Sequence, residues 1–468
     1  MSWEKVKLEQ FLKNRKGRYK PNDKAILGLK RIDKIDFAGN IYLSEKPSNT
    51  DMILVKKGDL VISGINVEKG AMNIYLGEDD VVATIHYSSY EFDENNIDIE
   101  FLKWFLKSIE FKNALKEQVP GGIKTEIKPK HILPLEVFIP TDFEEQKSIV
   151  KNLNRNNNSV NNVSSELTNQ LNLIKQLRQS FLREAIQGKL VSNDTKDGKT
   201  GAELLAEIQT EKENLIKEKK LKEGKLTKNS KSILNFHIPK NWIFTKFNNL
   251  FFVTKLAGFE YTDYMKLEKT GDIPVIRAQN VRNLNIETTN LLYINLETSL
   301  LLNRCALTKE CLLITFIGAG IGDVATFIEK ERWHLAPNVA KAEPFENCDR
   351  YYTLKYFNYF LISDYGKSEI IKHIKATAQP SLSMETIRDI DIPLPPLEIQ
   401  DRIVSKLDEL MQFCDQLETS VKESQKLNEQ LLQQVLREAL QPKAKEVVLP
   451  LVAEDREEYS KTKVVELK

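Results

Sequence analysis

The sequence predicts an α+β fold made of two similar mixed α/β domains and two long helices, arranged as an internal repeat. Between residues 398 and 443, apolar residues recur at alternating steps of four and three, which is typical of a long helix packed lengthwise on another helix. Residues 144–187 carry the same pattern, and Gln146 to Gln400 and Leu182 to Leu436 are both 254 positions apart. Because the segments before the two helices also repeat, the chain is predicted to be a duplication with pseudo-two-fold symmetry.

The composition limits the class of protein but does not indicate a partner. At 468 residues the chain has room for two or three domains, each with its own core. The 68 Lys and Arg residues balance 67 Asp and Glu, so only the distribution of charge can point to a ligand. The start of the chain has no signal-peptide run, and no stretch approaches the roughly 20 apolar residues of a membrane span. We therefore expect a soluble, cytoplasmic protein.

The cysteines and histidines argue against a metal site or a disulfide framework. Four cysteines occur in the second half of the chain without CxxC spacing, which favours reduced thiols. Five histidines are scattered without the spacing of metal ligands. They also give no basis for histidine-assisted nucleophilic catalysis. We expect no metal site and no catalytic residue in this chain.

Residues 1–140 are predicted to form the first domain, which is rich in short strands. Runs of β-branched or aromatic residues at 81–85 and 135–139 favour strands. Apolar positions from Phe101 to Leu115 favour a single amphipathic helix over 99–115.

The first 35 residues are strongly basic, with 11 Lys or Arg against 4 Asp or Glu. Such a run is commonly a solvated face, and the alternative is a surface that contacts phosphates. Gly17 and Pro21 place its densest part in a loop, where side chains can reach a partner. The candidate DNA-binding residues here are Arg15, Lys16, Arg18, Lys20, Lys24, Lys30 and Arg31.

Residues 141–230 are predicted to be a helical region that follows this domain. A capping sequence at 142–145 begins a long helix over 142–187, and Gly188 ends it. At about 1.5 Å per residue this helix is on the order of 65 to 70 Å long, which suits a spacer. A second helix at about 201–222 and a Lys-rich linker complete the region.

The second domain is predicted at 231–397, the second long helix at 398–442 and a C-terminal tail at 443–468. Residues 57–62 match residues 309–314, and residues 102–105 match residues 354–357, each pair of segments 252 positions apart. The stretch before the first of these segments is longer in the second copy. Two scaffolds of one plan with different loops suit two readers of different ligands.

The two long helices are predicted to meet along an apolar seam. Polar residues interrupt it at Asn156 and Gln170, and at Ser424 and Asn428 in the second copy, where they would fix the register of the helices. The predicted seam residues are Leu153, Val160, Val163, Leu167, Leu177, Leu407, Leu410, Cys414, Leu417, Val421 and Leu431.

A glycine-rich loop from Gly318 to Asp323 follows a strand-like run and is similar to a nucleotide- or methyl-donor-binding loop. Such a loop needs a helix directly after it, so that the helix N-terminus faces the anionic group. Here a second strand-like run follows at 324–328, which favours a hairpin turn or a close approach of backbone to a ligand.

Side chains that suit base edges cluster after a strand-like run in the second domain. Arg, Gln and Asn carry the paired donors and acceptors that match bases in the major groove. A basic stretch at 27–31 is the expected counterpart in the first domain. The candidates are Arg277, Gln279, Asn280, Arg282, Asn338, Lys341, Gln379 and Ser381, each of which could instead be an ordinary surface residue.

Two segments carry a family resemblance. Residues 393–418, including Pro395, Gln400 and Leu410, closely resemble the distal conserved region of specificity (S) subunits of type I restriction-modification enzymes. Residues 177–191 and 202–213 resemble their central conserved region. The chain departs from the family pattern at residues 140–143, Pro-Thr-Asp-Phe, where Pro-Pro-Leu is usual before the first helix, and at Glu310-Cys311, where Gly-Asp is usual.

The resemblance implies two target recognition domains, each of which reads one half of a bipartite site in double-stranded DNA. It implies that the long helices pack antiparallel between them and dock two methyltransferase (modification) subunits, to which restriction/translocase subunits add. S-adenosylmethionine, ATP and Mg would then be used by those partners. This chain would bind no cofactor, and we expect it not to associate with a membrane.

Two other functions compete with DNA recognition by a non-catalytic subunit. One is a DNA methyltransferase-like enzyme that uses the loop from Gly318 to Asp323. The other is a coiled-coil scaffold that binds only protein. Donor binding by the isolated chain would favour the first, and a lack of salt-dependent DNA binding would favour the second.

Overall fold

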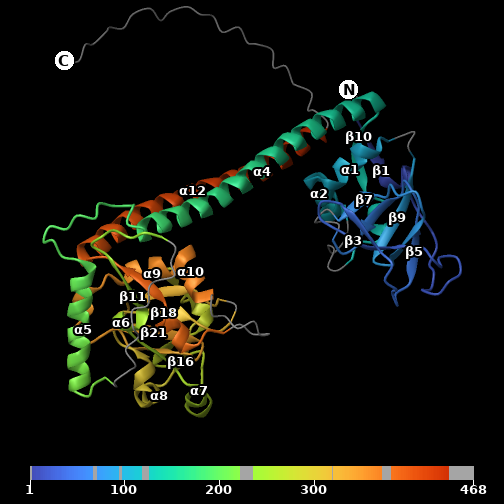
Figure 1. Cartoon of the computed structure of the whole chain (residues 1–468). Helices are drawn as coiled ribbons and strands as arrows, with labels where there is room; N and C mark the ends of the chain where they lie inside the picture. The colour runs from blue at the N-terminus through green and yellow to red at the C-terminus, as the bar shows by residue number, and fades with distance from the viewer. Residues whose placement is uncertain are drawn as a thin grey trace, which may run out of the picture. The chain divides into compact units, whose positions relative to one another are not determined.

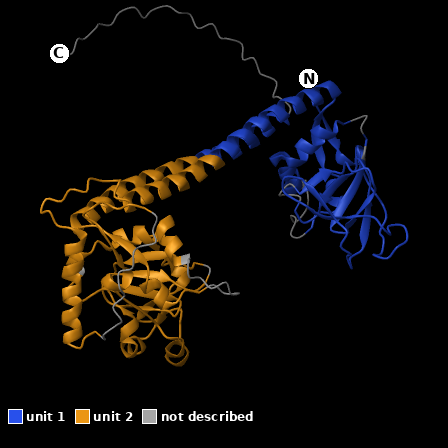
Figure 2. Cartoon of the chain, viewed as in Figure 1, with its two compact units in different colours: residues 1–167, 423–468 blue, residues 168–422 orange. Residues whose placement is uncertain are grey.

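The computed structural model describes residues 3–66, 71–93, 97–118, 126–221, 236–318, 320–371 and 381–441. The chain divides into two compact units, each with its own core (Figure 2). Unit 1 comprises residues 1–167 and 423–468, and unit 2 comprises residues 168–422. The division falls part-way along both long helices, whereas the sequence places domain boundaries at their ends. The predicted C-terminal tail lies outside the described residues.

The two long helices are α4 (Phe143–Ile186) and α12 (Leu397–Ala439), which run side by side (Figure 1). Asp142 caps α4, because its carboxylate accepts a hydrogen bond from the Glu144 N–H at 3.0 Å. Gly188 ends the helix in the left-handed conformation at φ 67°, and a Cβ there would lie 2.3 Å from Pro239.

The helices pack antiparallel. In unit 1, Val160 contacts Asn428, while Leu153 shares a core cluster with Leu436, so residue numbers rise along one helix as they fall along the other. The same order holds in unit 2, where Arg178 pairs with acidic residues of α12 beyond position 414 and Leu182 lies in a core cluster with Leu407. The antiparallel arrangement expected from the family resemblance is therefore confirmed.

The seam differs from the prediction at two positions. Val163 is 47% exposed and Leu431 is 53% exposed, so neither is a seam residue. Buried positions on α4 follow steps of seven, and Ile174 continues that series where the prediction omitted it. Leu153, Val160, Leu167, Leu407 and Cys414 are buried, and Leu177, Leu410, Leu417 and Val421 are half-buried.

Polar groups fix the register of the helix pair. The Asn428 side chain is buried, and its amide donates to the Val160 carbonyl at 2.9 Å across the seam. In unit 2, the Arg178 guanidinium pairs with Asp415 at 2.7 Å and Glu418 at 3.0 Å. A shift of either helix by one residue would break these bonds, which supports the predicted role of Asn428.

The first domain consists of a short two-stranded sheet, two four-stranded sheets and three helices. The strand orders are β1-β10, β2-β9-β6-β7 and β4-β3-β8-β5. The strands are β1 (Trp3–Lys7), β2 (Leu12–Asn14), β3 (Arg31–Ile35), β4 (Ile41–Ser44), β5 (Met52–Val55), β6 (Leu60–Ser63), β7 (Met72–Ile74), β8 (Val81–Thr84), β9 (Tyr87–Phe92) and β10 (Glu136–Pro140). The helices are α1 (Ile99–Lys107), α2 (Ile109–Gln118) and α3 (Pro129–Ile132), with a 3-10 turn at Leu8–Gln10.

The second domain repeats the three sheets and adds one small hairpin. The strand orders are β11-β22, β12-β21-β18-β19, β16-β13-β20-β17 and β14-β15. The strands are β11 (Ile243–Lys246), β12 (Phe251–Lys255), β13 (Ile273–Ile276), β14 (Val281–Arg282), β15 (Asn285–Ile286), β16 (Leu292–Ile294), β17 (Ala306–Leu307), β18 (Cys311–Thr315), β19 (Val324–Phe327), β20 (Trp333–Leu335), β21 (Val339–Pro344) and β22 (Asp391–Leu394). The helices are α6 (Phe247–Leu250), α7 (Gly258–Tyr264), α8 (Leu296–Leu301), α9 (Leu354–Ile362), α10 (Asp364–Ile371) and α11 (Met384–Arg388).

The duplication extends to the register of the sheets. Leu60 pairs with Tyr90 in the first domain, and Leu312 pairs with Ala342 in the second. Both partners are displaced by 252 positions, so the pairing of β6 with β9 and of β18 with β21 is the same. The predicted repeat of the domains is confirmed strand by strand.

The predicted single helix over 99–115 is wrong, because Ser108 divides it into α1 and α2. Ser108 takes an extended conformation, donates its hydroxyl to the Phe105 carbonyl at 2.6 Å and accepts from the Phe111 N–H. Ser363 does the same between α9 and α10, donating to the Phe360 carbonyl at 2.6 Å. A local serine hydrogen bond thus replaces the helical one in both copies.

Helix α5 (Gly201–Lys217) covers one side of unit 2. Thr200 caps it by accepting from the Glu203 N–H, as the sequence predicts. The helix ends at Lys217, five residues before the predicted end at 222. Lys219, just after this end, takes a positive φ of 59°. Gly201 is required for contact with the sheet, since a Cβ there would lie 2.1 Å from the Leu394 carbonyl oxygen.

All four cysteines are buried free thiols, and none of the described helices is long and apolar enough to cross a membrane. Cys414 is buried in the helix seam, as predicted.

We predict that Asn428→Ala lowers the free energy of unfolding by about 0.5 to 1.5 kcal/mol, because the bond to the Val160 carbonyl is lost. Urea denaturation followed by circular dichroism measures this change. Asn158→Ala on the exposed face of α4 is the matched control and should change stability little. Equal losses in both variants would mean that the buried amide does not stabilise the pair.

We predict that the buried imidazole of His334 on β20 makes the stability of unit 2 sensitive to acid. Burial lowers the pKa of His334, although the carbonyls of Leu335 and Leu302, at 3.0 and 3.2 Å, oppose this. His334 therefore binds a proton more readily in the unfolded chain than in the folded one. The contribution of its neutral imidazole to stability is fully present above about pH 6.5 and decreases as the pH falls below that value. His334→Gln should reduce the difference in urea midpoint between pH 7.5 and 5.5. Exposed His237→Gln should leave it unchanged.

Candidate nucleic-acid interface

The glycine-rich loop of the second domain is the turn of a β-hairpin. It connects β18 to the antiparallel strand β19, and Gly318 and Gly322 take positive φ angles of 107° and 84°. The Thr315 N–H donates to the Asp323 carbonyl at 3.0 Å, which closes the loop. The predicted hairpin is confirmed. The loop has no helix after it, so the backbone donors that a nucleotide- or methyl-donor-binding loop would supply are missing from this position.

Two other loops of unit 2 and the end of β12 meet this hairpin. The Phe316 N–H donates to the Asn338 carbonyl at 3.1 Å, and the Leu382 N–H donates to the Phe316 carbonyl at 2.9 Å. Ser381 forms a β-bridge with Ile317. The structure thus brings the predicted residues Asn338 and Ser381 to one place. The Lys255 ammonium, which the sequence did not indicate, lies 4.8 Å from the centre of the Phe316 ring.

The β14–β15 hairpin brings Arg282 to the same side of the domain. The Val324 N–H donates to the Asn283 side chain at 3.3 Å, and the Leu284 N–H to the Val324 carbonyl at 2.9 Å. Burial raises the pKa of Asp323, and the positive charge of Arg282 partly opposes that rise. Arg282 and Gln279 are exposed and can reach a ligand.

Two predicted contacts in unit 2 belong to the framework of the domain. Asn280 is buried, accepts from the Arg277 N–H and donates to the Glu287 carbonyl. Lys341 is buried and donates to the Ala306 carbonyl at 2.7 Å and to Glu343 at 2.8 Å. A DNA contact for either residue is contradicted by this burial.

Arg277 is held within its loop, and one further candidate cannot be placed. The Arg277 guanidinium donates to the Asn290 carbonyl at 2.6 Å, which leaves a half-buried side chain beside the loop. Gln379 lies outside the described residues.

The first domain has the same backbone arrangement at its own hairpin. The Gly64 N–H donates to the His86 carbonyl at 2.8 Å, and the Ile127 N–H donates to the Gly64 carbonyl at 2.7 Å. Gly64 and His86 precede Phe316 and Asn338 by 252 positions. We call these two pairs of backbone bonds the hairpin frame. It places His86 where Asn338 stands, and Glu126 where Ser381 stands.

The basic segment of the first domain is largely neutralised by carboxylates. Arg31 pairs with Asp33 at 2.7 Å, Arg18 and Lys20 share Asp51, and Lys30 lies 3.9 Å from Glu45. The net positive charge of the first 35 residues is therefore not a free basic surface. Lys16 and Lys24 are exposed, and no ion-pair partner is found for them among the described residues.

Arg15 is a framework residue rather than a phosphate contact. Its guanidinium donates to Asp59 at 2.6 and 2.8 Å and pairs with Glu91 at 2.6 Å. Burial alone would raise the pKa of Asp59, but the bonds from Arg15, the Lys56 N–H and Ser89 outweigh it and lower the pKa. The sequence did not indicate this role of Asp59.

The stretch at 27–31 is not the counterpart of Arg277. Arg31 pairs with Val82 and Val275 pairs with His334, and these partners are 252 positions apart, so Arg31 shares the register of Val275, two residues before Arg277. Counting basic residues could not reveal this, because the register of a strand is set by its pairing with neighbouring strands.

The two domains pair one equivalent glutamate with a cation in different ways. Glu91 and Glu343 occupy the same register on β9 and β21. Arg15 pairs with the first and Lys341 with the second. The departure noted at Glu310-Cys311 falls here, because buried Cys311 replaces Asp59, so the second domain has no acid that needs a cation from β12.

Residues 239–429 match a family model described as the type I restriction modification DNA specificity domain. This segment belongs to that family. For residues 239–429 the family predicted from the conserved motifs is thus confirmed, and the first domain shares the sheet topology of this segment.

The chain is similar in sequence to two proteins named as type I specificity subunits. The chain is 23% identical over 297 residues to the type I restriction enzyme EcoBI specificity subunit of Escherichia coli, covering 63% of this chain and 56% of that protein. It is 28% identical over 268 residues to the EcoEI specificity subunit of the same organism, covering 54% and 43%. The chain therefore spans about half the length of these curated relatives.

The fold has a relative among solved structures. A chain from a structural study of complex assembly and conformational transition of the type I R-M system has a TM-score of 0.59 at 14% identity. The similarity covers 94% of this chain and 98% of that chain. At this identity the likeness concerns the fold.

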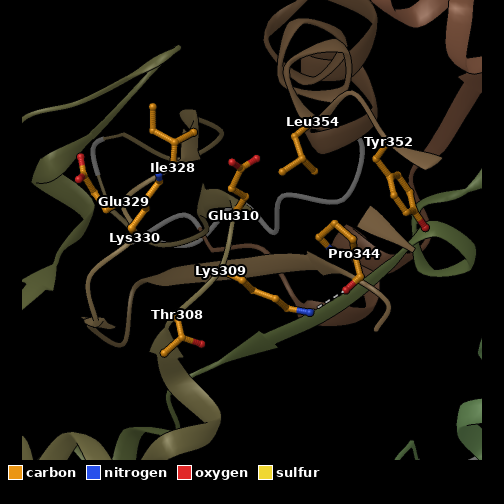
Figure 3. A pocket seen from close by; sticks show the side chains of 9 residues that line it. All are labelled: Thr308, Lys309, Glu310, Ile328, Glu329, Lys330, Pro344, Tyr352 and Leu354. Atoms are coloured by element: carbon orange, nitrogen blue, oxygen red, sulfur yellow. Dashed lines mark hydrogen bonds between the residues drawn. The ribbon is translucent and has the colours of Figure 1, made fainter. Parts of the chain in front are cut away.

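A separate cavity of about 490 Å³ lies at the opposite end of β18 and β19 from the hairpin loop (Figure 3). Lys309 lies along it and donates to the Pro344 carbonyl at 3.1 Å. Glu310 and Lys330 line the same opening, so its walls carry both signs of charge. This mixed lining does not favour DNA, and it makes Lys330 a suitable control position. Among the described residues, no cluster of His, Cys, Asp or Glu could hold a metal ion.

We predict that Arg15→Met lowers the free energy of unfolding by about 2 to 3 kcal/mol, because it leaves Asp59 buried without its cation. Exposed Lys16→Met should change it by less than about 0.5 kcal/mol. The stabilising effect of the pair should be present above about pH 3.9 and fade as the pH drops towards the lowered pKa of Asp59. A stable Arg15→Met variant with weak DNA binding would instead make Arg15 a phosphate contact.

Proposed function

We propose that this chain is the DNA-specificity subunit of a type I restriction-modification complex. Each of its two recognition domains would read one half of a bipartite site in double-stranded DNA. The observation that carries this proposal is the hairpin frame, which both domains share while the side chains that it presents differ. A common scaffold with different exposed polar groups is what reading two different half-sites requires.

The polar groups gathered at the frame in unit 2 suit base recognition. Arg282 and Gln279 are exposed, and Asn338, on the loop bonded to the β18–β19 hairpin, is half-buried. A guanidinium matches the two acceptors of guanine, and a carboxamide matches the donor and acceptor of adenine. Lysines at the edge of the frame, such as Lys16 and Lys255, would hold phosphates and orient the domain.

The chain would act with partners and would not itself catalyse. Two methyltransferase subunits would dock on the long helices, and restriction/translocase subunits would join them. S-adenosylmethionine, ATP and Mg would be used by those subunits. The specificity-subunit motifs in both long helices support this proposal.

The two competing functions have less support. A methyltransferase-like enzyme would need its donor loop at the β18–β19 hairpin, where a strand follows in place of a helix. A protein-only scaffold gives no reason for two domains with one frame and different side chains. Binding of the chain and its methyltransferase partner to duplex DNA at a series of salt concentrations tests the second, because phosphate contacts make affinity fall steeply with salt.

We predict that Arg282→Ala relaxes recognition in one half-site only, at a cost of about 1 to 3 kcal/mol for the base it contacts. Methylome sequencing of a host that expresses the chain with its methyltransferase partner returns the bipartite motif directly. The variant should degrade one position of one half and leave the other half unchanged.

The control for this experiment is Lys330→Ala, which removes an exposed charge at the far end of the same hairpin. It should leave both halves of the motif intact. If Arg282→Ala weakened methylation of all sites equally, Arg282 would be a phosphate contact. If the wild-type complex methylated no bipartite motif, the proposed function would be wrong.

A further inference from the structure

The hairpin frame of the first domain presents an imidazole and a carboxylate where the second presents an amide and a hydroxyl. His86 and Asn338 both accept a backbone bond from the hairpin, at 2.8 and 3.1 Å. Glu126 and Ser381 directly precede Ile127 and Leu382. The N–H groups of those two residues donate to the hairpin carbonyls of Gly64 and Phe316, at 2.7 and 2.9 Å. Backbone bonds therefore fix all four positions. Only the chemistry of the side chains differs between the domains.

His86 and Glu126 already form a pair that is open to solvent. His86 Nδ1 lies 3.3 Å from Glu126 Oε1, and the two side chains are 51% and 24% exposed. They line a cavity of about 490 Å³ whose other walls come from residues 14–18, 53, 85, 87–89 and 127–129. A preformed polar pair in an open cavity can meet a ligand with little loss of side-chain freedom.

Gly64 makes room for this pair. A Cβ at position 64 would lie 2.6 Å from the Ile127 carbonyl oxygen and 2.9 Å from Glu126 Cγ. In the second domain the equivalent residue is the buried Phe316, and its neighbour across the frame is the smaller Ser381. In the first domain, the small Gly64 on the hairpin is thus combined with the larger Glu126. In the second domain, the large Phe316 is combined with the small Ser381.

The pair has a defined hydrogen-bonding character. An ionised carboxylate only accepts hydrogen bonds, so contact with Glu126 places the imidazole proton on Nδ1 and leaves Nε2 as an acceptor. The free lone pairs of Glu126 are acceptors too. In the major groove, the bases that present donors are adenine, through its N6 amino group, and cytosine, through its N4 amino group.

Cations surround the cavity. Lys16, Arg18 and Lys128 line it; Arg18 pairs with Asp51 at 2.8 Å, and the Lys128 ammonium lies 3.8 Å from Glu126, which leaves Lys16 as the cation without a carboxylate partner among the described residues. Lys16 occupies the position of Lys255 in the second domain, since Asn14 and Val253 share one register on β2 and β12. Basic groups beside an acceptor pair suit a base flanked by phosphates.

We propose that His86 and Glu126 are the base-reading pair of the first recognition domain, and that they select adenine or cytosine through its exocyclic amino group. This inference rests on the proposed function. The amide of Asn338, which both donates and accepts, would serve a different base preference at the same position of the second half-site.

Exchange of the pair for that of the other domain tests this directly. The variant His86→Asn/Glu126→Ser is expressed with the methyltransferase partner, and the methylome is sequenced. One adenine or cytosine position in one half of the motif should lose about 10- to 100-fold of its preference. The other half should keep its sequence. Asn338→Ala should change only that other half.

The outcomes separate this inference from the proposed function. If the exchange variant methylates an unchanged bipartite motif, the pair is structural and the inference is wrong, while the proposed function stands. A motif absent even with the wild-type chain overturns the proposed function. Thermal unfolding checks that the variant folds, and if it does not, His86→Asn alone gives the same decision because Glu126 and the backbone bonds are kept. Lys330→Ala again serves as the control.

Discussion

The hairpin frame is the constraint on which the rest of each recognition domain depends. Its backbone N–H and carbonyl groups are satisfied by β9 or β21 on one side and by the segment before α3 or α11 on the other. Buried backbone groups cannot lose their partners without a large cost in free energy. The frame therefore holds its register while the side chains on it differ. This separation lets one fold present His86 in one domain and Asn338 in the other.

Charge in the first domain is used mainly to hold the fold. The basic start of the chain reads as a phosphate-binding surface when only its residues are counted. In the structure, Asp51, Asp59 and Glu91 from later in the chain pair with Arg15, Arg18 and Lys20. What remains for a ligand is a small number of exposed cations, such as Lys16 and Lys24. The position of a charge matters more here than the number of charges.

In the helix pair, a buried polar residue within an apolar seam fixes the register of the two helices. A buried Asn428 costs stability relative to leucine, but its bond to the Val160 carbonyl is made in only one register. Arg178 adds a second fixed point within unit 2. At the offset of 254, Asn428 corresponds to the apolar Ile174, so units 1 and 2 fix the helix pair with different bonds.

The sequence by itself determined the duplication, the two long helices and the family. These follow from periodicity and from matching motifs at a constant offset, which are local or one-dimensional properties of a chain. It also determined that the glycine-rich loop is a hairpin, since a strand-like run follows it. The tertiary structure decided which candidate residues are available. Asn280, Lys341 and Arg15 look like surface polar residues until the sheets bury them. His86 and Glu126 look unremarkable because they are 40 positions apart in the sequence. The reason is that exposure and proximity depend on strand pairing between distant segments, and no local pattern in the sequence records that pairing.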